Sequence, residues 1–154
     1  MDTPAANPIG KACACVVDAR GRLLVFHHPG DRGMQLVKGT IETGESPEDA
    51  VRRELLEESG LHFDGPLEPL GTLLRHCDAG HEGNDHTHVQ LWHLFLMRID
   101  TPLPERFEHT AHGSPEEDGL VFDFRWLSEG EPLDGFTLPY RQAIERVWQA
   151  LGRT

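Results

Sequence analysis

Apolar residues follow two different spacings along the chain. In several short runs they alternate with polar residues or stand side by side, which is typical of strands, and in two longer stretches they recur every three or four residues, which is typical of an amphipathic helix. Clusters of Gly, Pro and Asp separate these runs and indicate turns. The pattern predicts strands on both sides of a turn at 18–21 within 11–28, further strands at 34–38, 70–76, 87–99 and 120–127, helices at 47–59 and 138–151, and irregular chain at 28–33, 77–86 and 100–119.

The stretch 47–59 carries the strongest helix signals. Ser46 precedes it as an N-cap, with Asp49 three residues later completing a capping box. Pro47 occupies the first helical position, where its missing N–H costs nothing, and Gly60 supplies a stop at the other end. The apolar stripe of this helix consists of Ala50, Val51 and Leu55.

The order of these elements is strands, helix, strands, helix. This order predicts an α/β fold in which a mixed sheet is flanked by helices, an α/β sandwich. At 154 residues the chain has the length of one domain, and no composition shift marks an internal boundary. We therefore expect a single domain over residues 1–154, with 1–9 as a loose lead-in.

The composition limits the classes of molecule that the protein is expected to bind and the compartment in which it is expected to work. The formal net charge of −12 disfavours DNA and other phosphate backbones, which need a basic surface, but a bound divalent cation would still allow small phosphate ligands. No apolar run approaches the roughly 20 residues of a membrane span, and no signal peptide opens the chain. Cys13 and Cys15 alternate within an apolar strand and Cys77 is a third, so we expect reduced cysteines in a cytoplasmic protein.

Three glutamates gather on the polar side of the predicted helix at 47–59. On a helix of 3.6 residues per turn, Glu54, Glu57 and Glu58 share one face, and Arg53 lies beside them. Together with backbone carbonyls of the loop that begins at Gly39, such carboxylates suit a hard cation such as Mg²⁺ or Mn²⁺. A solvated acidic helix face is the alternative that geometry leaves open.

The spacing of these residues resembles a known motif. Gly39 is followed after five residues by Glu45, and after seven more by Arg53-Glu54-Leu55-Leu56-Glu57-Glu58-Ser59-Gly60-Leu61. This is similar to the Nudix box, G-x5-E-x7-R-E-U-x-E-E-x-G-U with U a bulky aliphatic residue, at every specified position. The resemblance implies a Nudix-type α/β/α sandwich and an enzyme that hydrolyses a phosphoanhydride in a nucleoside diphosphate linked to another group X.

The resemblance also assigns roles. It implies that Glu57 and Glu58 hold the catalytic divalent ions, Mg²⁺ with Mn²⁺ as a substitute, and that Glu54 is a further ligand or the base that activates water. Arg53 would orient Glu54, and Glu45 would brace the loop or Arg53. The physics agrees, because a carboxylate face can hold a diphosphate only through a metal ion.

The residues before the box depart from the usual pattern. Many family members have a Trp-x-x-Pro-Gly-Gly entry, whereas this chain has Met34 and ends the segment with Lys38 and Gly39. Lys38 replaces a glycine whose carbonyl often binds metal, and a lysine still offers that carbonyl. Such an entry resembles some dinucleoside polyphosphate hydrolases and MutT-like enzymes, in which the lysine can meet a phosphate. A solvent-exposed lysine without contacts is the alternative.

Histidines and late acids supply further candidates. Cys77, His81 and His86 have spacings that would suit zinc, but a polar loop beside the active site is the preferred interpretation. We expect His88 and His93 to face opposite sides of their strand. The candidates for substrate binding are Lys38, His28, His76 and His88. The candidates for an acid that completes the site are Glu116, Glu117, Asp118 and Asp123, and Trp92, Phe95 and Trp126 are taken as core aromatics.

The box predicts the chemistry, while the loops around it choose X. A dinucleoside polyphosphate or a nucleoside triphosphate is the favoured substrate. The negative net charge makes the triphosphate end of RNA a less favoured one. A nucleotide-binding sensor or regulator of the same fold, without turnover, stays open although every box glutamate is present. A homodimer is possible through Leu56 or the strand at 87–99.

Overall fold

The computed structural model describes residues 7–30, 33–77 and 88–152. Within these ranges the predicted elements are present, with one additional strand and one predicted strand divided into two. In chain order they are β1 (Ile9–Val17), β2 (Leu23–His27), β3 (Met34–Gln35), β4 (Val37–Thr40), α1 (Pro47–Ser59), β5 (Glu68–Cys77), β6 (His88–Arg98), β7 (Arg106–Thr110), β8 (Val121–Leu127) and α2 (Leu138–Ala150).

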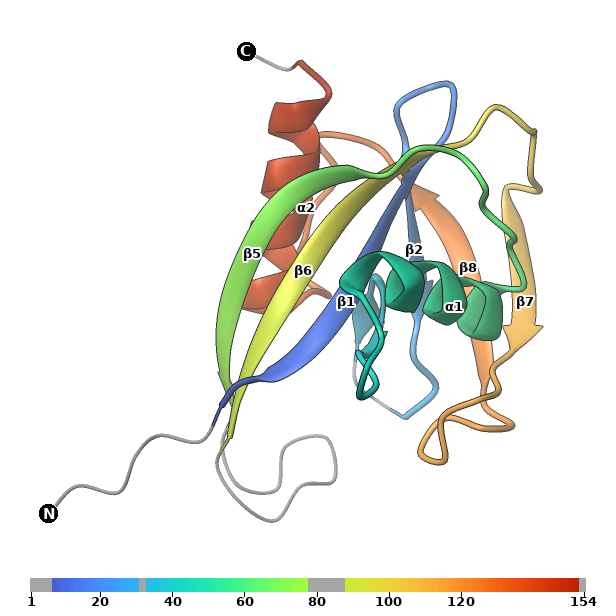
Figure 1. Cartoon of the computed structure of the whole chain (residues 1–154). Coiled ribbons are helices and arrows are strands. Elements are labelled where there is room, and N and C mark those ends of the chain that lie inside the picture. Colours follow the sequence, from blue (N-terminus) through green and yellow to red (C-terminus); the bar gives the residue numbers. More distant parts are fainter. Residues whose placement is uncertain (1–6, 31–32, 78–87, 153–154) are drawn as a thin grey trace, which may run out of the picture.

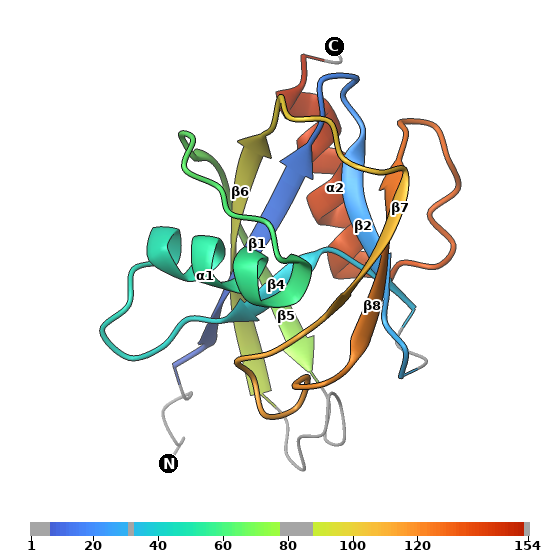
Figure 2. The same cartoon turned by 90° about the vertical axis from the view of Figure 1, so that its right-hand side faces the viewer.

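The strands form one mixed sheet in the order β5-β6-β1-β2-β8-β7, with β3 beside β2 and β4 beside β1. β1 and β6 are parallel, and the other pairs are antiparallel. α1 covers one face of the sheet and α2 covers the other, as Figures 1 and 2 show from two sides. The prediction of an α/β/α sandwich is therefore confirmed.

The sheet forks at β1, and the fork positions the box. One edge of β1 pairs with β6 along its whole length, from Ile9 to Val17. On the other edge β2 pairs only at the end, where Val17 lies opposite Leu23, while β4 pairs with Lys11–Ala14. Because β4 occupies the place that β2 leaves, the first residues of the box are built into the sheet directly before α1.

Each helix buries its apolar stripe against the sheet. Ala50, Val51 and Leu55 of α1 join a core cluster on one face, and Ala143, Ile144 and Val147 of α2 join the cluster on the other. The caps of α1 also match the sequence. The hydroxyl of Ser46 accepts a hydrogen bond from the Asp49 N–H, and Gly60 ends the helix in the left-handed conformation, at φ 78°.

Two elements differ from the prediction. Residues 100–119 are not wholly irregular, because Arg106–Thr110 form β7 at the edge of the sheet beside β8. Phe107 is the one apolar residue of this strand, so the sequence shows no apolar face that would predict it. In the structure Phe107 stacks on Phe124. The predicted strand at 34–38 is two strands, since the chain changes partner from β2 to β1 at Leu36.

Three further expectations concern the first residues, the cysteines and membrane spans. β1 begins at Ile9, within the segment expected to be loose. Cys13, Cys15 and Cys77 are buried and free. Among the described residues, no helix has the length and apolar character needed to span a membrane.

Candidate active site

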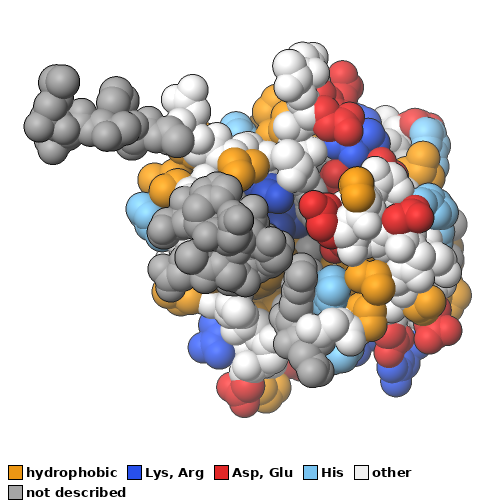
Figure 3. Space-filling view, turned by 90° about the horizontal axis from the view of Figure 1, so that it is seen from below, with side chains coloured by type: hydrophobic (Ala, Val, Ile, Leu, Met, Phe, Trp, Pro, Cys, Tyr) orange, Lys and Arg blue, Asp and Glu red, His pale blue; other side chains and the backbone are white. Residues whose placement is uncertain are grey.

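A cleft of about 410 Å³ opens at the lower end of the sheet, between β4, the start of β6, the face of α1 that carries Arg53 and the loop between β7 and β8. Figure 3, which views the molecule from below, shows basic side chains beside acidic ones near the centre of this face. Its lining includes Lys11, Lys38, Gly39, Thr40, Arg53, Glu54, His88, Gln90, Gly113, Glu116 and Glu117.

Arg53 connects three carboxylates of the box. Its Nε and one terminal nitrogen donate to the two oxygens of Glu45, at 2.7 and 2.9 Å. The other terminal nitrogen donates to Glu54 at 2.8 Å and to Glu57 at 3.0 Å. The Glu42 N–H also donates to Glu45, so Glu45 contacts both the loop and Arg53. This charge-assisted pairing holds the pKa of the Glu45 carboxyl below its usual range.

The acidic face of α1 is more enclosed than the sequence suggests. The Glu54 and Glu58 side chains are buried, and Glu57 is largely covered. A β-carbon on Gly39 would lie 1.8 Å from the carboxyl carbon of Glu54, and one on Gly113 would lie 2.2 Å from a Glu57 oxygen. β4 and the loop after β7 therefore press on this face, which excludes the solvated helix face.

Burial shapes the charge of these carboxyls. Removal from water raises the pKa of Glu58 well above its usual value, and the nearby charge of Glu117 raises it further. Burial also raises the pKa of Glu54, against the opposing effects of a hydrogen bond with Glu58 and of Arg53. One oxygen of Glu58 is buried without a hydrogen-bond partner among the described residues.

These carboxyls suit a hard divalent cation. The buried Glu58 oxygen has no donor and lies near the acids Glu54 and Glu117. A bound cation would stabilise its ionised form in place of a proton. No three His, Cys, Asp or Glu side chains of the described chain already converge as a preformed ligand set. Arg53 instead binds Glu54 and Glu57, so these two carboxylates are paired with the guanidinium, whereas Glu58 is not.

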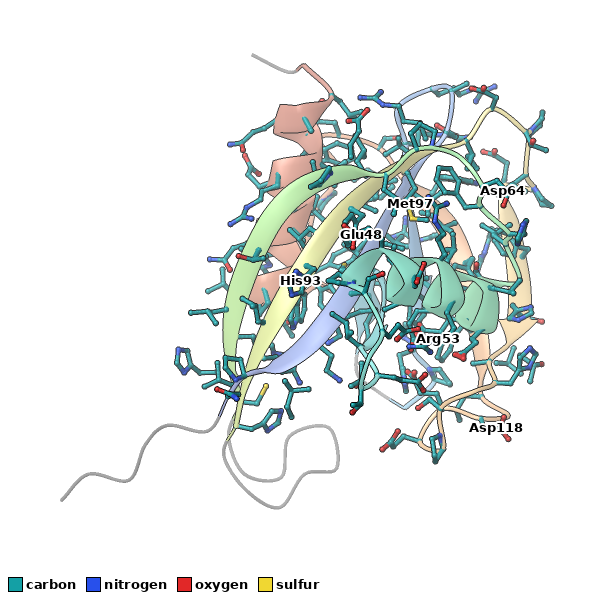
Figure 4. The ribbon with its side chains drawn as sticks, viewed as in Figure 1. Glu48, Arg53, Asp64, His93, Met97 and Asp118 are labelled. Atoms are coloured by element: carbon teal, nitrogen blue, oxygen red, sulfur yellow. The ribbon has the colours of Figure 1, made fainter. Side chains whose placement is uncertain are left out.

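The late acids fall in different places. Glu116 and Glu117 line the cleft. Asp118 is exposed and does not line it, and in Figure 4 it lies on the loop below α1, away from Arg53. Asp123 pairs with Arg106 on the neighbouring strand, outside the cleft. Of these four candidates, the structure brings only Glu116 and Glu117 to the site.

Lys38 forms part of the opposite wall. Its ammonium lies 4.2 Å from the centre of the Trp92 ring and 5.4 Å from that of Tyr140. These cation–π contacts exclude a solvent-exposed lysine without partners, and the ammonium is buried against the two rings. Lys11 adds a second cation to the lining, and it donates to the Thr40 hydroxyl at 2.7 Å.

His88 lines the cleft and is held by a chain of hydrogen bonds from Trp92 through Gln90. The Trp92 indole N–H donates to the amide oxygen of Gln90 at 2.9 Å, and the amide nitrogen of Gln90 lies 3.1 Å from Nε2 of His88. Because an indole can only donate, the Gln90 oxygen must face Trp92 and its NH₂ must face His88. His88 Nε2 is therefore the acceptor, and the neutral ring carries its proton on Nδ1.

The other predicted histidines do not line the cleft. His76 is exposed on β5, and His28 is buried behind the cleft wall. Neither is among the residues that line the cleft, so for both the substrate contact stays a prediction. His88 and His93 lie on opposite faces of β6, as predicted, because the register there is unbroken. In Figure 4 His93 lies on the sheet, to the left of α1. His81 and His86 of the zinc alternative lie outside the described residues.

Sequence reasoning missed Lys11 and Gln90. Both are polar residues within otherwise apolar strands, which is the signal that could have marked them. Trp92, Phe95 and Trp126 are buried core residues, as predicted, and none of them lines the cleft.

Comparison with known proteins places this architecture. A family model described as the NUDIX domain matches residues 8–147. A protein of Tolumonas auensis named RNA pyrophosphohydrolase is 28% identical over 138 residues, which cover 86% of this chain and 77% of that protein. One of the same name from Aeromonas hydrophila is 29% identical over 136 residues, covering 82% and 74%.

Solved structures share the fold. The dihydroneopterin triphosphate pyrophosphohydrolase of E. coli superposes with a TM-score of 0.72 at 16% identity, over 97% of this chain and 99% of that one. An Ap4A hydrolase of C. elegans gives 0.62 at 14% identity, over 94% and 98%. With the family model matching nearly the whole chain and the complete box on α1, the chain belongs to the NUDIX family and is a Nudix hydrolase.

Proposed function

We propose that this hydrolase uses a divalent cation, Mg²⁺ with Mn²⁺ as a substitute, to cleave a phosphoanhydride bond of a nucleoside 5′-polyphosphate. The observation that carries the proposal is the composition of the cleft. Glu54 of α1 and the acid Glu117 line it together with Lys11 and Lys38, and the buried Glu58 is hydrogen-bonded to Glu54. A polyphosphate needs both a cation held by carboxylates and fixed positive charge.

Glu54, Glu57 and Glu58 would hold the cation, together with Glu117 and backbone carbonyls at Lys38 and Gly39. When bound, the cation would neutralise phosphate charge and lower the pKa of a water molecule. Glu58 offers an oxygen without a donor, whereas Glu57 must first leave Arg53. We therefore rank Glu58 before Glu57 as a ligand, where the family resemblance alone ranked them equally.

The remaining groups act on water and phosphate. Arg53 orients the Glu54 carboxylate, which takes the proton of the attacking water in our assignment. Lys11 receives phosphate oxygens, and Lys38, whose ammonium is buried on two aromatic rings, adds positive charge behind the wall. His88 lines the same wall and is our candidate for a further substrate contact. Gly113 lies against the Glu57 carboxylate and covers it in part.

A dinucleoside polyphosphate or a nucleoside triphosphate is the proposed substrate. The cleft is open at one side and lined by polar groups, and the C. elegans neighbour is titled an Ap4A hydrolase. The triphosphate end of RNA is the second candidate, since the curated relatives are named RNA pyrophosphohydrolase. The net charge of −12 argues against a long RNA contact beyond the triphosphate.

The test is product release from nucleoside triphosphates, a dinucleoside tetraphosphate and a 5′-triphosphorylated oligoribonucleotide, with Mg²⁺, Mn²⁺ or EDTA. The variant is Glu58→Gln, and Asp118→Asn on the exposed part of the late loop is the matched control. Metal-dependent turnover that falls in Glu58→Gln and persists in Asp118→Asn supports the proposal. Nucleotide binding that raises Tm without turnover of any substrate supports the sensor instead.

Compartment and assembly follow from other residues. We infer a cytoplasmic enzyme from three buried, free cysteines, which are typical of reducing compartments. Leu56 is 46% exposed on the outer side of α1 and is the candidate contact of a homodimer. Light scattering of the wild type and of Leu56→Glu tests that contact.

A further inference from the structure

His28, at the end of β2, has a fixed tautomer. Its Nδ1 accepts a hydrogen bond from the Gly30 N–H at 3.0 Å. A nitrogen that accepts from a backbone N–H carries no proton, so the ring is neutral and its proton lies on Nε2. The side chain is 3% exposed, and its ring packs against Phe122 with 5.3 Å between ring centres. Both its rotation and its protonation state are therefore set by the surroundings.

The Nε2–H of His28 is aimed at the cleft acid Glu117. The distance from His28 Nε2 to the nearer Glu117 oxygen is 3.6 Å, and this nitrogen has no hydrogen-bond partner among the described residues. A buried N–H without an acceptor is unfavourable, so the pair gains when the carboxylate moves closer. A short rotation of the Glu117 side chain would bring the oxygen within hydrogen-bond distance.

The backbone around Glu117 is already held. The Glu117 N–H donates to the Ser114 carbonyl, the Gly119 N–H to the Ala111 carbonyl, and the Leu120 N–H to the Glu117 carbonyl. These bonds close the turn between β7 and β8, so the position of the carboxylate depends on the side chain alone. On its other side Glu117 acts electrostatically on the buried Glu58. Glu117 thus stands between a fixed donor and the carboxyls of the box.

We propose that His28 is a positioning residue that holds Glu117 at the catalytic cleft through an Nε2–H···O hydrogen bond. The proposal rests on the proposed function, because Glu117 matters only if the cleft performs the hydrolysis. His28 does not line the cleft and does not touch substrate. It acts by limiting the orientations of the one late acid that faces Glu58.

A double-mutant cycle tests the proposal. His28→Phe removes the donor and keeps a flat ring, His28→Gln restores an N–H near the position of Nε2, and Glu117→Ala removes the acceptor. We expect His28→Phe to lower kcat/KM by about 10–100-fold, as for groups that orient metal-site ligands, and His28→Gln to recover most of the loss. In the Glu117→Ala background, His28→Phe should change kcat/KM little. An equal loss in both backgrounds would overturn the proposal, since it would show that His28 supports only the fold.

A spectroscopic measurement separates this inference from the proposed function. Long-range ¹H–¹⁵N spectra of the wild type should show His28 with a protonated Nε2 and a bare Nδ1, and Glu117→Ala should shift the Nε2–H resonance. A resonance that does not respond to Glu117→Ala contradicts the contact, whatever the enzyme hydrolyses. Inactivity of the wild type on all substrates, with the shift present, would instead count against the proposed function. The thermal unfolding of each variant shows whether the fold is kept.

Discussion

Gly39 lies directly against the carboxyl group of Glu54. A β-carbon at Gly39 would stand 1.8 Å from the Glu54 carboxyl carbon and within 2.2 Å of both its oxygens. Gly39 is opposite Ala12 in the pairing of β4 with β1, so the strand cannot move away without breaking the sheet. The backbone of Gly39 is regular strand, so its conformation does not require glycine. Glycine is required because a larger side chain would overlap the Glu54 carboxylate.

This contact predicts the effect of Gly39→Ala. The added methyl group must displace the Glu54 carboxylate from Arg53, and small displacements of catalytic groups lower rates by about 100-fold. Overpacking at a buried site also destabilises a protein by about 1–3 kcal/mol. Steady-state kinetics and chemical denaturation measure the two effects. Activity close to wild type would contradict the proposed use of Glu54.

Gly44→Ala, in the loop that follows β4, is the matched control. Gly44 has φ 80°, which strains an alanine, but no atom lies within 4 Å of the position of its β-carbon. We expect a loss of about 1 kcal/mol from the backbone conformation and kcat/KM close to wild type.

Adjacent arginines of α1 should respond differently to lysine. Arg53→Lys keeps the positive charge, but one ammonium cannot bind Glu45, Glu54 and Glu57 at the distances that the guanidinium spans. We expect kcat/KM to fall by about 10–100-fold, as when orienting groups are lost.

Arg52→Lys is the comparison. Arg52 donates to the carbonyls of Phe63 and Gly65, on the chain that leaves α1, and does not line the cleft. Its loss should lower stability by about 1 kcal/mol and leave kcat/KM near the wild-type value. Equal kinetic losses in the two variants would show that Arg53 has no special role.

The box helix could be predicted from sequence because its information is local. Ser46, Pro47 and Gly60 define its ends within a few residues, and the apolar stripe defines its buried side. The enclosure of Glu54 and Glu58 could not be predicted in this way. It arises where β4 and the loop between β7 and β8 meet α1, from residues far apart in the chain.

β7 and His28 illustrate the same limit. β7 lies at the sheet edge with alternating polar residues, so its sequence does not distinguish it from a loop. The histidine beside a Pro-Gly loop suggested substrate contact, but its tautomer and its aim at Glu117 depend on Gly30 and on a turn about ninety residues away. Side-chain identity marked the candidates, and tertiary structure decided their roles.

The Trp92–Gln90–His88 chain makes a prediction about protonation. Gln90→Glu keeps an acceptor for the buried Trp92 N–H but replaces the donor to His88 Nε2 with a carboxylate oxygen. The Nε2 of His88 should then carry a proton and donate it to that oxygen, because a carboxylate can only accept. ¹⁵N spectra distinguish the two states. A neutral ring of unchanged tautomer in Gln90→Glu would show that Gln90 does not control His88.

Stability should depend on pH through Glu58. The pKa of Glu58 is raised in the folded protein above the usual 4.5, chiefly by burial. The folded state therefore holds a proton that the unfolded chain has released, so this contribution to stability is complete below pH 4.5 and is lost as the pH rises through the folded pKa. Without metal, wild-type stability should fall over that range relative to Glu58→Gln, which cannot ionise.

Thermal unfolding in EDTA at about pH 5 and about pH 8 measures this difference. Glu58→Gln should gain on the wild type as the pH rises, with each kcal/mol raising Tm by about 2–4 °C. At the higher pH, Mg²⁺ should raise the Tm of the wild type above that of Glu58→Gln. It binds the ionised Glu58 of the wild type and so stabilises the folded state. If the two proteins keep the same Tm difference at both pH values, and Mg²⁺ shifts them equally, Glu58 is neither a buried titrating group nor a ligand.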